Sequence, residues 1–346
     1  MKKNISKSKK SNILSLCQIN IDDHYLQKIS KLTNLIDLKL YDCVSLHTKL
    51  DFLQKMTSLQ NLSLPFSKIH DDDICCLKPL TNLIKLELTQ NPLNGVGFAN
   101  MYFPNLVTLI MIRVNLNIDG IKRICESSPN LQEFDHYADY YEGKFDNACL
   151  LEICTKLKYL RELILCDVNC FDYELLNLST SLESLSIHHT PNPSNYIGFP
   201  KIIPTIDPKY NNLNTFPVLT KIKSLSLSIR FSELIMPKIN LYSSLEQLSI
   251  SCLTNDLNYF DLVKLTNLTD LKIHAYLCNN NLIFLEQMPQ LKKLDLRYNH
   301  DIDIESVRYF TNFVNLQYLN LVGTTIKKCN MNEIKKNVND TCQICL

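Results

Sequence analysis

Three pairs of cysteines and one pair of histidines have the types and spacing that could do chemistry. They are Cys75-Cys76, Cys166 and Cys170, Cys342 and Cys345, and His188-His189. A structural zinc site needs four ligands, and no second C-x-x-C pair accompanies the one at the C-terminus. Adjacent residues on a strand point to opposite faces, so the two histidines would not meet at one ion. The sequence therefore predicts neither a metal site nor a cofactor.

The usual catalytic motifs are absent from the sequence. There is no Gly-rich phosphate loop, nucleophile elbow or H-E-x-x-H motif. Several cysteines fall instead where a repeating pattern places core residues, and buried cysteine behaves as a small hydrophobe. These are Cys43, Cys125, Cys154 and Cys166. We predict a chain that is not an enzyme.

The pattern that positions these residues is clearest in the segment Leu80–Leu93. Its leucines at 83, 86, 88 and 93, with Asn91 between the last two, follow L-x-x-L-x-L-x-x-N-x-L, which is a repeat signature. Most successive copies begin 22–25 residues apart. The first leucine or isoleucine of each copy is Leu35, Leu59, Leu83, Leu106, Leu131, Leu160, Leu182, Ile222, Leu245, Leu268, Leu291 and Leu316.

Each copy predicts one short strand and one return segment. The last two apolar positions of each triplet lie two residues apart, which is the period of a strand. Return segments such as 71–77, 119–125, 147–153 and 303–309 have acidic starts or apolar residues at helical spacing. We therefore expect an α/β solenoid, a horseshoe with a parallel β-sheet on its concave side and short α or 3-10 helices on its convex side.

Copies that begin with Leu-Thr-Asn-Leu at residues 32, 80 and 265 resemble leucine-rich repeats of the phosphatase-regulator and internalin type. Longer copies with a cysteine after the strand resemble the cysteine-containing class found in ubiquitin-ligase substrate receptors. The resemblance implies a curved solenoid that binds another macromolecule, usually a protein, on its concave face. The composition, low in Gly and rich in Asn, Lys and Ile, also resembles leucine-rich proteins of giant amoeba viruses of the mimivirus type.

We predict a basic disordered tail over residues 1–10, a solenoid of about twelve repeats plus an N-terminal cap over 11–326, and a C-terminal cap or tail over 327–346. Two intervals are longer than the rest. The first contains His136–Glu142, with His136 on a core position. The second contains a proline-rich loop insertion near 188–217, and a loop of such length in a compact array is often functional or disordered.

Charge and composition limit the partners and the compartment. A formal net charge of +1 gives no electrostatic reason to expect nucleic acid. No apolar run is long enough to cross a membrane, and the N-terminus lacks the apolar stretch of a secretory signal. Fourteen cysteines in a chain that is not secreted indicate free thiols. We expect a cytoplasmic monomer, with a nuclear location as the other option.

The predicted function is a non-catalytic scaffold that binds a protein partner on the concave face. The alternative is a substrate receptor of a ubiquitin ligase, although residues 1–30 show no helical F-box pattern. Mixed charges and aromatic side chains between the core leucines suit a protein interface. The predicted partner-binding residues are Tyr41, Lys85, Glu87, Ile112, Arg113, Tyr137, His188, His274, Arg297, Tyr298 and Tyr318; Ile110, Glu133, Asp135, Lys272 and Asp295 share their face.

Overall fold

A computed structural model of the 346-residue chain describes residues 12–18, 21–43, 50–138, 144–168, 170, 172–188, 216–228, 232, 234–251, 259–311, 313–338 and 341–346. The proline-rich insertion lies almost wholly outside these ranges, as do residues 1–10. The chain divides into two compact units, one of residues 1–170 and 178–180 and the other of residues 171–177 and 181–346. The predicted boundaries of tail, solenoid and cap stay predictions.

Strands β1 to β7 belong to the first unit and β8 to β14 to the second. The strands are β1 (Ile13–Cys17), β2 (Asp37–Tyr41), β3 (Asn61–Ser63), β4 (Lys85–Glu87), β5 (Thr108–Ile112), β6 (Glu133–Tyr137), β7 (Glu162–Cys166), β8 (Ser184–His188), β9 (Ser224–Leu227), β10 (Gln247–Ser251), β11 (Asp270–His274), β12 (Lys293–Asp295), β13 (Tyr318–Asn320) and β14 (Gln343–Cys345).

Short helices connect the strands, and most of them are 3-10 helices. The α-helices are α1 (Asp23–Ile29), α2 (Ile118–Ser127), α3 (Asn147–Lys156) and α5 (Met331–Asn337). The 3-10 helices are η1 (Leu50–Lys55), η2 (Asp71–Leu77), η3 (Val96–Phe98), η4 (Tyr173–Leu178), η7 (Met236–Leu241), η8 (Tyr259–Lys264), η9 (Asn279–Gln287), η10 (Ile304–Phe310) and η11 (Lys328–Asn330).

Within each unit the strands are parallel and lie in sequence order, so each leucine meets its counterpart in the next repeat. In the first unit Leu38, Leu62, Leu86 and Leu109 stand side by side and are almost completely buried. Strands β2 to β13 all begin two residues after the predicted first leucine or isoleucine. The predicted phase of the repeats is confirmed, and the fold is the predicted leucine-rich repeat solenoid, in which parallel strands alternate with short helical return segments wherever the return segment is described.

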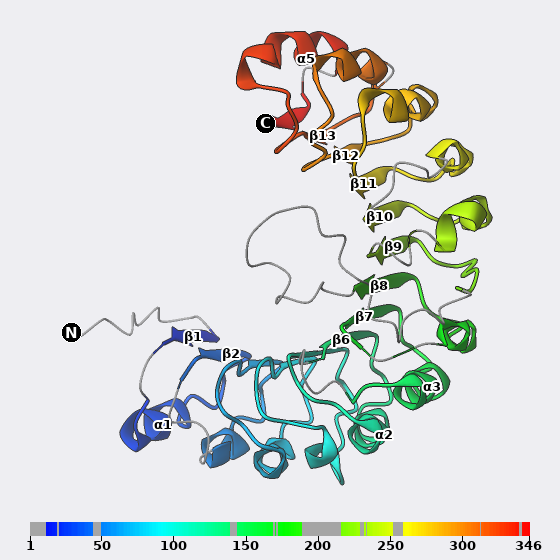
Figure 1. The fold of residues 1–346 in the computed structure, drawn as a ribbon. Helices are drawn as coiled ribbons and strands as arrows, with labels where there is room; N and C mark the ends of the chain where they lie inside the picture. The colour runs from blue at the N-terminus through cyan, green and yellow to red at the C-terminus, as the bar shows by residue number, and fades with distance from the viewer. Residues whose placement is uncertain are drawn as a thin grey trace, which may run out of the picture. The chain divides into compact units, whose positions relative to one another are not determined.

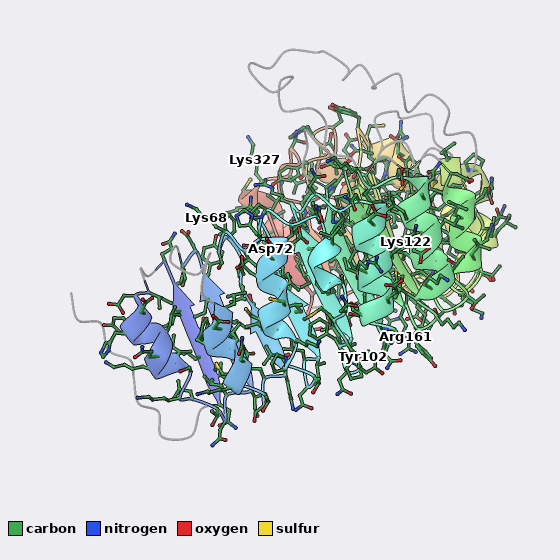
Figure 2. The ribbon with its side chains drawn as sticks, turned by 90° about the horizontal axis from the view of Figure 1, so that it is seen from below. Lys68, Asp72, Tyr102, Lys122, Arg161 and Lys327 are labelled. Atoms are coloured by element: carbon green, nitrogen blue, oxygen red, sulfur yellow. The ribbon has the colours of Figure 1, made fainter. Side chains whose placement is uncertain are left out.

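In both units the helices cover one face of the sheet (Figure 1). The side chains that alternate with the buried leucines point to the other face, which we call the open face. On β2, for example, Leu38 and Leu40 are buried while Lys39 and Tyr41 are exposed. Figure 2 shows the helical side, with Asp72 labelled on η2 and Lys122 on α2.

Two buried asparagines hold the turns that follow the strands. The side-chain amide of Asn91 donates to the carbonyls of Leu64 and Leu88, and its oxygen accepts from the N–H groups of Ser67 and Ile69. Asn299 makes the same four kinds of bond. Where this asparagine is replaced, the smaller Ser67 and Thr324 still donate to turn carbonyls. Backbone groups that would otherwise be buried without partners are thus satisfied.

A second set of asparagines lies at the turns that lead into the strands. Each donates its side-chain amide to the carbonyl of the equivalent turn in the preceding repeat, so these entry-turn asparagines also tie neighbouring repeats together. The pairs are Asn82 to Thr57, Asn105 to Thr81, Asn130 to Pro104, Asn267 to Ser243 and Asn315 to Pro289.

Two glycines let return segments of the first unit approach closely. A Cβ on Gly97 would lie 2.2 Å from the carbonyl oxygen of Asp71, and one on Gly120 would lie 1.9 Å from that of Asn94. The Asp71 carboxylate also accepts the N–H groups of Asn94, Gly95 and Gly97. Three successive return segments are therefore in direct backbone contact at these glycines.

Regular elements lie near both ends of the array. Leu14 and Leu16 lie on β1, and Ile334 is buried in α5. Cys345 is the last residue of β14, which pairs with β13, and Cys342 directly precedes that strand. In the described part of the chain, no helix has the length and apolar character needed to cross a membrane.

The fold predicts a large loss of stability for Asn91→Ala. The substitution would leave four buried backbone groups without partners, and such groups cost about 1 kcal/mol or more each. We expect the free energy of unfolding to fall by about 3–5 kcal/mol in urea titrations. Asn82→Ala removes a single exposed hydrogen bond and should cost less than about 1 kcal/mol. Equal losses for the two variants would contradict the role given to Asn91.

Candidate protein-interaction surface

All eleven predicted partner-binding residues keep part of their side chain accessible. Eight lie on the strands, and Arg113, Arg297 and Tyr298 lie in the turns just after β5 and β12. Tyr41, Lys85, Glu87, Ile112, Arg113 and Tyr137 belong to the first unit, and His188, His274, Arg297, Tyr298 and Tyr318 to the second. The structure therefore divides the predicted residues between two units, which are treated separately below.

A row of left-handed residues borders the open face where the strands end. Phe66, Arg113 and Tyr298 have φ of 56°, 54° and 64°. Their N–H groups donate to the carbonyls of Thr89, Tyr137 and Val322 in the following repeat, which fixes this backbone geometry. The row, here called the edge row, is Gln18, Asp42, Phe66, Gln90, Arg113 and Asp167 in the first unit and Tyr298 in the second.

The edge row holds large side chains where glycine would be less strained. A left-handed conformation costs a residue with a Cβ about 1 kcal/mol or more. Strained non-glycine residues often cluster at functional sites. Phe66 and Tyr298 are also well exposed, so neither side chain is retained to fill the core. Phe66 was missed from the sequence, because nothing in its local pattern separates it from an ordinary turn residue.

An aromatic pair lies at this border in the described part of each unit. The ring of Tyr41 on β2 lies 5.1 Å from that of Phe66 in the next repeat. The ring of His274 on β11 lies 6.2 Å from that of Tyr298, again one repeat further on. Both pairs join the last open-face residue of a strand to the edge-row residue of the following repeat. Exposed aromatic side chains of this kind often carry binding energy.

The open face of β4–β7 in the first unit is acidic and partly apolar. Four carboxylates and one lysine point from these strands, and none of the four carboxylates forms a salt bridge with a described residue. Three half-buried isoleucines stand between them. The charged residues are Lys85, Glu87, Glu133, Asp135 and Glu162, and the isoleucines are Ile110, Ile112 and Ile164.

Asp135 is the most perturbed carboxylate of this group. Its burial, together with the negative charges of Glu162 and Glu87, raises its pKa to about 6, and Lys85 opposes the shift only in part. Its Oδ1 atom is buried without a hydrogen-bond partner among the described residues. Burial and the charge of Glu133 also raise the pKa of Glu162. These strands thus concentrate negative charge that Lys85 offsets only in part.

Serines dominate the open face of β8–β10 in the second unit. The Nε2 atom of His188, a predicted binding residue, lies 3.1 Å from the Oγ atom of Ser226. The sequence analysis did not predict this patch of small, uncharged side chains, although the strand register places each serine on the open face. The serines are Ser184, Ser186, Ser224, Ser226, Ser249 and Ser251.

Charged residues return on β11 to β13. The guanidinium of Arg297 forms a forked pair with the carboxylate of Asp295. Burial raises the pKa of Asp295, but the hydrogen bonds and charge of Arg297 outweigh it and leave that pKa below its usual value. Burial and Lys272 lower the pKa of His274, whose Nε2 atom lies 4.0 Å from Asp295. Here the charges compensate one another, in contrast to β4–β7.

Among the described residues, the histidines, cysteines and carboxylates do not come together as a metal site, and the buried cysteines are poorly placed to react. No group of three or more His, Cys, Asp or Glu side chains comes together there as a metal site. Cys43, Cys125, Cys154 and Cys166 are buried as predicted. Burial raises the pKa of the Cys125 and Cys154 thiols to about 12, which makes them poor nucleophiles.

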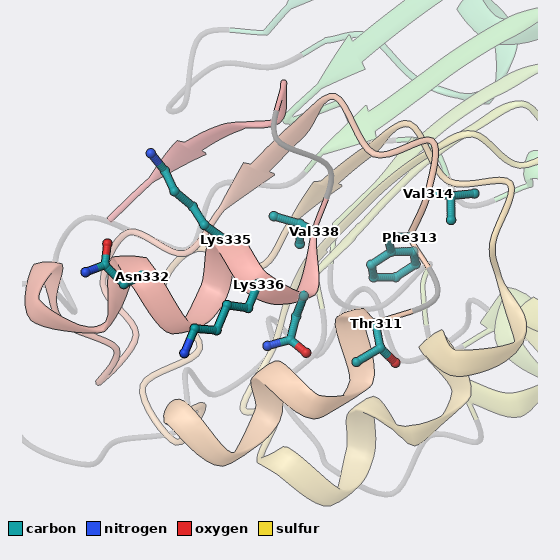
Figure 3. A pocket seen from close by; sticks show the side chains of 8 residues that line it. Thr311, Phe313, Val314, Asn332, Lys335, Lys336 and Val338 are labelled. Carbon is teal, nitrogen blue, oxygen red and sulfur yellow. The ribbon is translucent and has the colours of Figure 1, made fainter.

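A hollow of about 720 Å³ lies beside α5. Phe313, Val314 and Val338 form its apolar part, and Lys335 and Lys336 lie at its rim. The amines of the two lysines point in different directions (Figure 3). They therefore do not converge on one ligand group.

His136 occupies a leucine position in the core, as expected. It is fully buried, its ring is stacked 5.1 Å from that of Phe145, and its Nδ1 atom lies 3.0 Å from the carbonyl oxygen of Met111. Burial lowers its pKa to about 4, which outweighs the opposite effect of the Met111 carbonyl. The imidazole is therefore neutral at physiological pH, and its Nδ1–H group donates to the Met111 carbonyl. His136 is a packing residue of the core and is not available to a partner.

The chain is similar to solved leucine-rich repeat structures at low sequence identity. No protein-family model matches the chain, and no curated protein matches it by sequence. Among solved structures, an internalin from Listeria monocytogenes is similar at 18% identity over 97% of this chain and 86% of that chain, with a TM-score of 0.48. A leucine-rich repeat protein from Leptospira interrogans is similar at 17% identity over 97% of this chain and 96% of that chain, with a TM-score of 0.38.

The buried histidine predicts an acid-dependent loss of stability. The unfolded chain takes up a proton at the ordinary pKa of 6.5, whereas folded His136 does so only near 4, so stability falls as the pH drops from 6.5 towards 4. His136→Leu should remove up to about 3 kcal/mol of that loss. The measurement is the difference in unfolding free energy between the two proteins at several pH values.

Leucine suits this position, because Met111 and Leu165 are its neighbours in register. Asp135 acts in the opposite direction, since its folded pKa is raised, but both proteins contain it and its effect cancels in the difference. His300→Leu, at an exposed position, is the matched control and should follow the original pH profile. Parallel profiles for the original chain and His136→Leu would rule out this assignment.

Proposed function

We propose that the chain is a non-catalytic scaffold that binds a protein partner through the open face of its sheet, the face expected to be concave, and through the adjoining edge row. The observation that carries the proposal is the strained, exposed edge row, in which Phe66 and Tyr298 keep large aromatic side chains in a conformation that favours glycine. Packing of the core does not explain these side chains.

The composition of the open face also supports a protein partner. Its side chains combine aromatic rings, isoleucines and charges of both signs, and Tyr and Arg are enriched among residues that dominate binding energy. Buried leucines and buried turn asparagines hold the fold together, so the side chains of the open face are not needed to fill the core. We further propose a cytoplasmic or nuclear monomer, not directed to nucleic acid. The viral origin and the subtypes of repeat named above stay predictions.

The substrate receptor of a ubiquitin ligase remains the second hypothesis. A substrate receptor would also bind its partner through the open face, but it would in addition bind an adaptor protein of the ligase. Recovery of ligase adaptors together with the partner would favour it over a simple scaffold.

Replacement of two exposed aromatic residues should weaken partner capture. Tyr41→Ala with Tyr298→Ala removes one ring from each aromatic pair, and we expect recovery of specific partners from the cells that make the chain to fall at least roughly tenfold, the effect of about 1.4 kcal/mol. Because both side chains are exposed, the melting temperature should change little. Quantitative mass spectrometry of the captured proteins gives the measurement.

Tyr102→Ala with Tyr159→Ala is the matched control. These tyrosines are 57% and 59% exposed and lie on no strand, and Tyr102 is labelled in the view of the helical side (Figure 2). The control should retain full capture. If the Tyr41 and Tyr298 variant also retains it, the open face and its edge are not the binding surface.

A further inference from the structure

We propose that the open face of β4–β7 binds a short amphipathic segment of a partner protein that carries lysine or arginine beside apolar side chains. The proposal rests on the interaction function proposed above and specifies the partner chemistry for the first unit. It starts from a sheet face that the helices leave uncovered and that combines incompletely neutralised carboxylates with half-buried isoleucines.

The register brings the carboxylates close to one another. Glu87, Ile110, Asp135 and Ile164 occupy the same position on β4, β5, β6 and β7 and lie side by side across the sheet. The next row holds Lys85, Thr108, Glu133 and Glu162. Neighbouring strands are about 4.8 Å apart, so the four carboxylates fall within a span of about 15 Å.

Local donors compensate these carboxylates only weakly. Ser63 donates to Glu87 at 2.8 Å, and Thr108 donates to Glu133 at 2.7 Å, but both donors are neutral hydroxyls. Asp135 has a buried oxygen with no donor among the described residues. A cationic side chain that approached this face would relieve repulsion between carboxylates, which is the usual basis of electrostatic complementarity.

The isoleucines make the face more than an acidic cluster. Ile110 and Ile112 on β5 and Ile164 on β7 are half-buried side chains on a face where charged and polar residues surround them. Covering them would remove apolar surface from water, which stabilises association. The span of about 15 Å equals roughly ten residues of α-helix at 1.5 Å each. An amphipathic segment of about three turns therefore fits the four strands.

The test uses purified chain and three labelled 14-residue peptides. One alternates leucine and lysine at helical spacing, the second has glutamate for lysine, and the third has serine for leucine. Fluorescence anisotropy at low salt should show binding of the Leu/Lys peptide that is at least roughly tenfold tighter than that of either other peptide. Comparable binding of the Leu/Glu peptide would overturn the proposal.

Two double variants locate the site. Asp135→Asn with Glu162→Gln should weaken binding of the Leu/Lys peptide by about tenfold, since it removes two central charges. Glu305→Gln with Glu333→Gln removes two exposed charges from the second unit and should leave the affinity within about twofold. Equal losses in both variants would show attraction to overall charge only, and the proposal would fail.

Acid gives an independent readout. The charged groups around Asp135 are Lys85 and Glu87 on β4, Glu133 on β6 itself and Glu162 on β7, while β5 contributes no charge. Because the pKa of Asp135 is about 6, lowering the pH from about 7.5 to about 5.5 should weaken peptide binding, and Asp135→Asn should lose most of that dependence. An unchanged dependence in the variant would contradict the assignment.

The outcomes separate this inference from the proposed function. If the peptides fail to bind while the Tyr41 and Tyr298 variant still loses its cellular partner, the basic segment is excluded and the scaffold function stands. If the peptide binds as expected but capture is unaffected by the tyrosine variant, the site on β4–β7 stands and the aromatic edge is excluded.

Discussion

The satisfaction of buried backbone groups between neighbouring repeats is the constraint on which the rest of this structure depends. A single repeat leaves its leucines half covered and its turn carbonyls and N–H groups without partners. Asn91 and Asn299 each bond backbone groups of their own repeat and of the one before. The entry-turn asparagines bond only backward, and the edge-row N–H groups bond forward. Stability is therefore shared between adjacent repeats.

The phase of the repeats could be predicted because leucine spacing leaves no freedom. A slip of one residue would turn every core leucine towards water, so the twelve first leucines and isoleucines locate twelve strands. β14 was missed because Gln343–Cys345 is short, lacks leucine and is not deeply buried. Arg113 and Tyr298 of the edge row were predicted as binding residues, but Phe66 was not. The left-handed geometry of the row was missed because it comes from hydrogen bonds between repeats, of which Phe66 carries no local sign. The proline-rich insertion lies outside the described residues, so its role stays a prediction.

The chemistry of the open face depends on neighbours that are distant in sequence. Asp135 and Asp295 occupy the same position on β6 and β12, yet the pKa of the first is raised and that of the second is lowered. Burial raises the pKa of both carboxyl groups, and the neighbouring charges decide the outcome. Glu162 and Glu87 raise the pKa of Asp135 further, whereas Arg297 outweighs burial at Asp295. The sequence supplied the register that places both residues on the open face. The charges that surround each residue depend on side-chain positions in the structure, which the register alone does not give.

The contacts at Gly97 and Gly120 have a consequence for how this array can change in length. Backbone atoms of three consecutive return segments meet there with no room for a methyl group, so an added residue in any of them would disturb its contact with the adjacent segment. The intervals through this stretch keep the ordinary length, and the two longer intervals both begin after it, at Leu131 and Leu182. The glycines thus mark a stretch in which an insertion would break backbone contacts, and both longer intervals of this chain lie outside it.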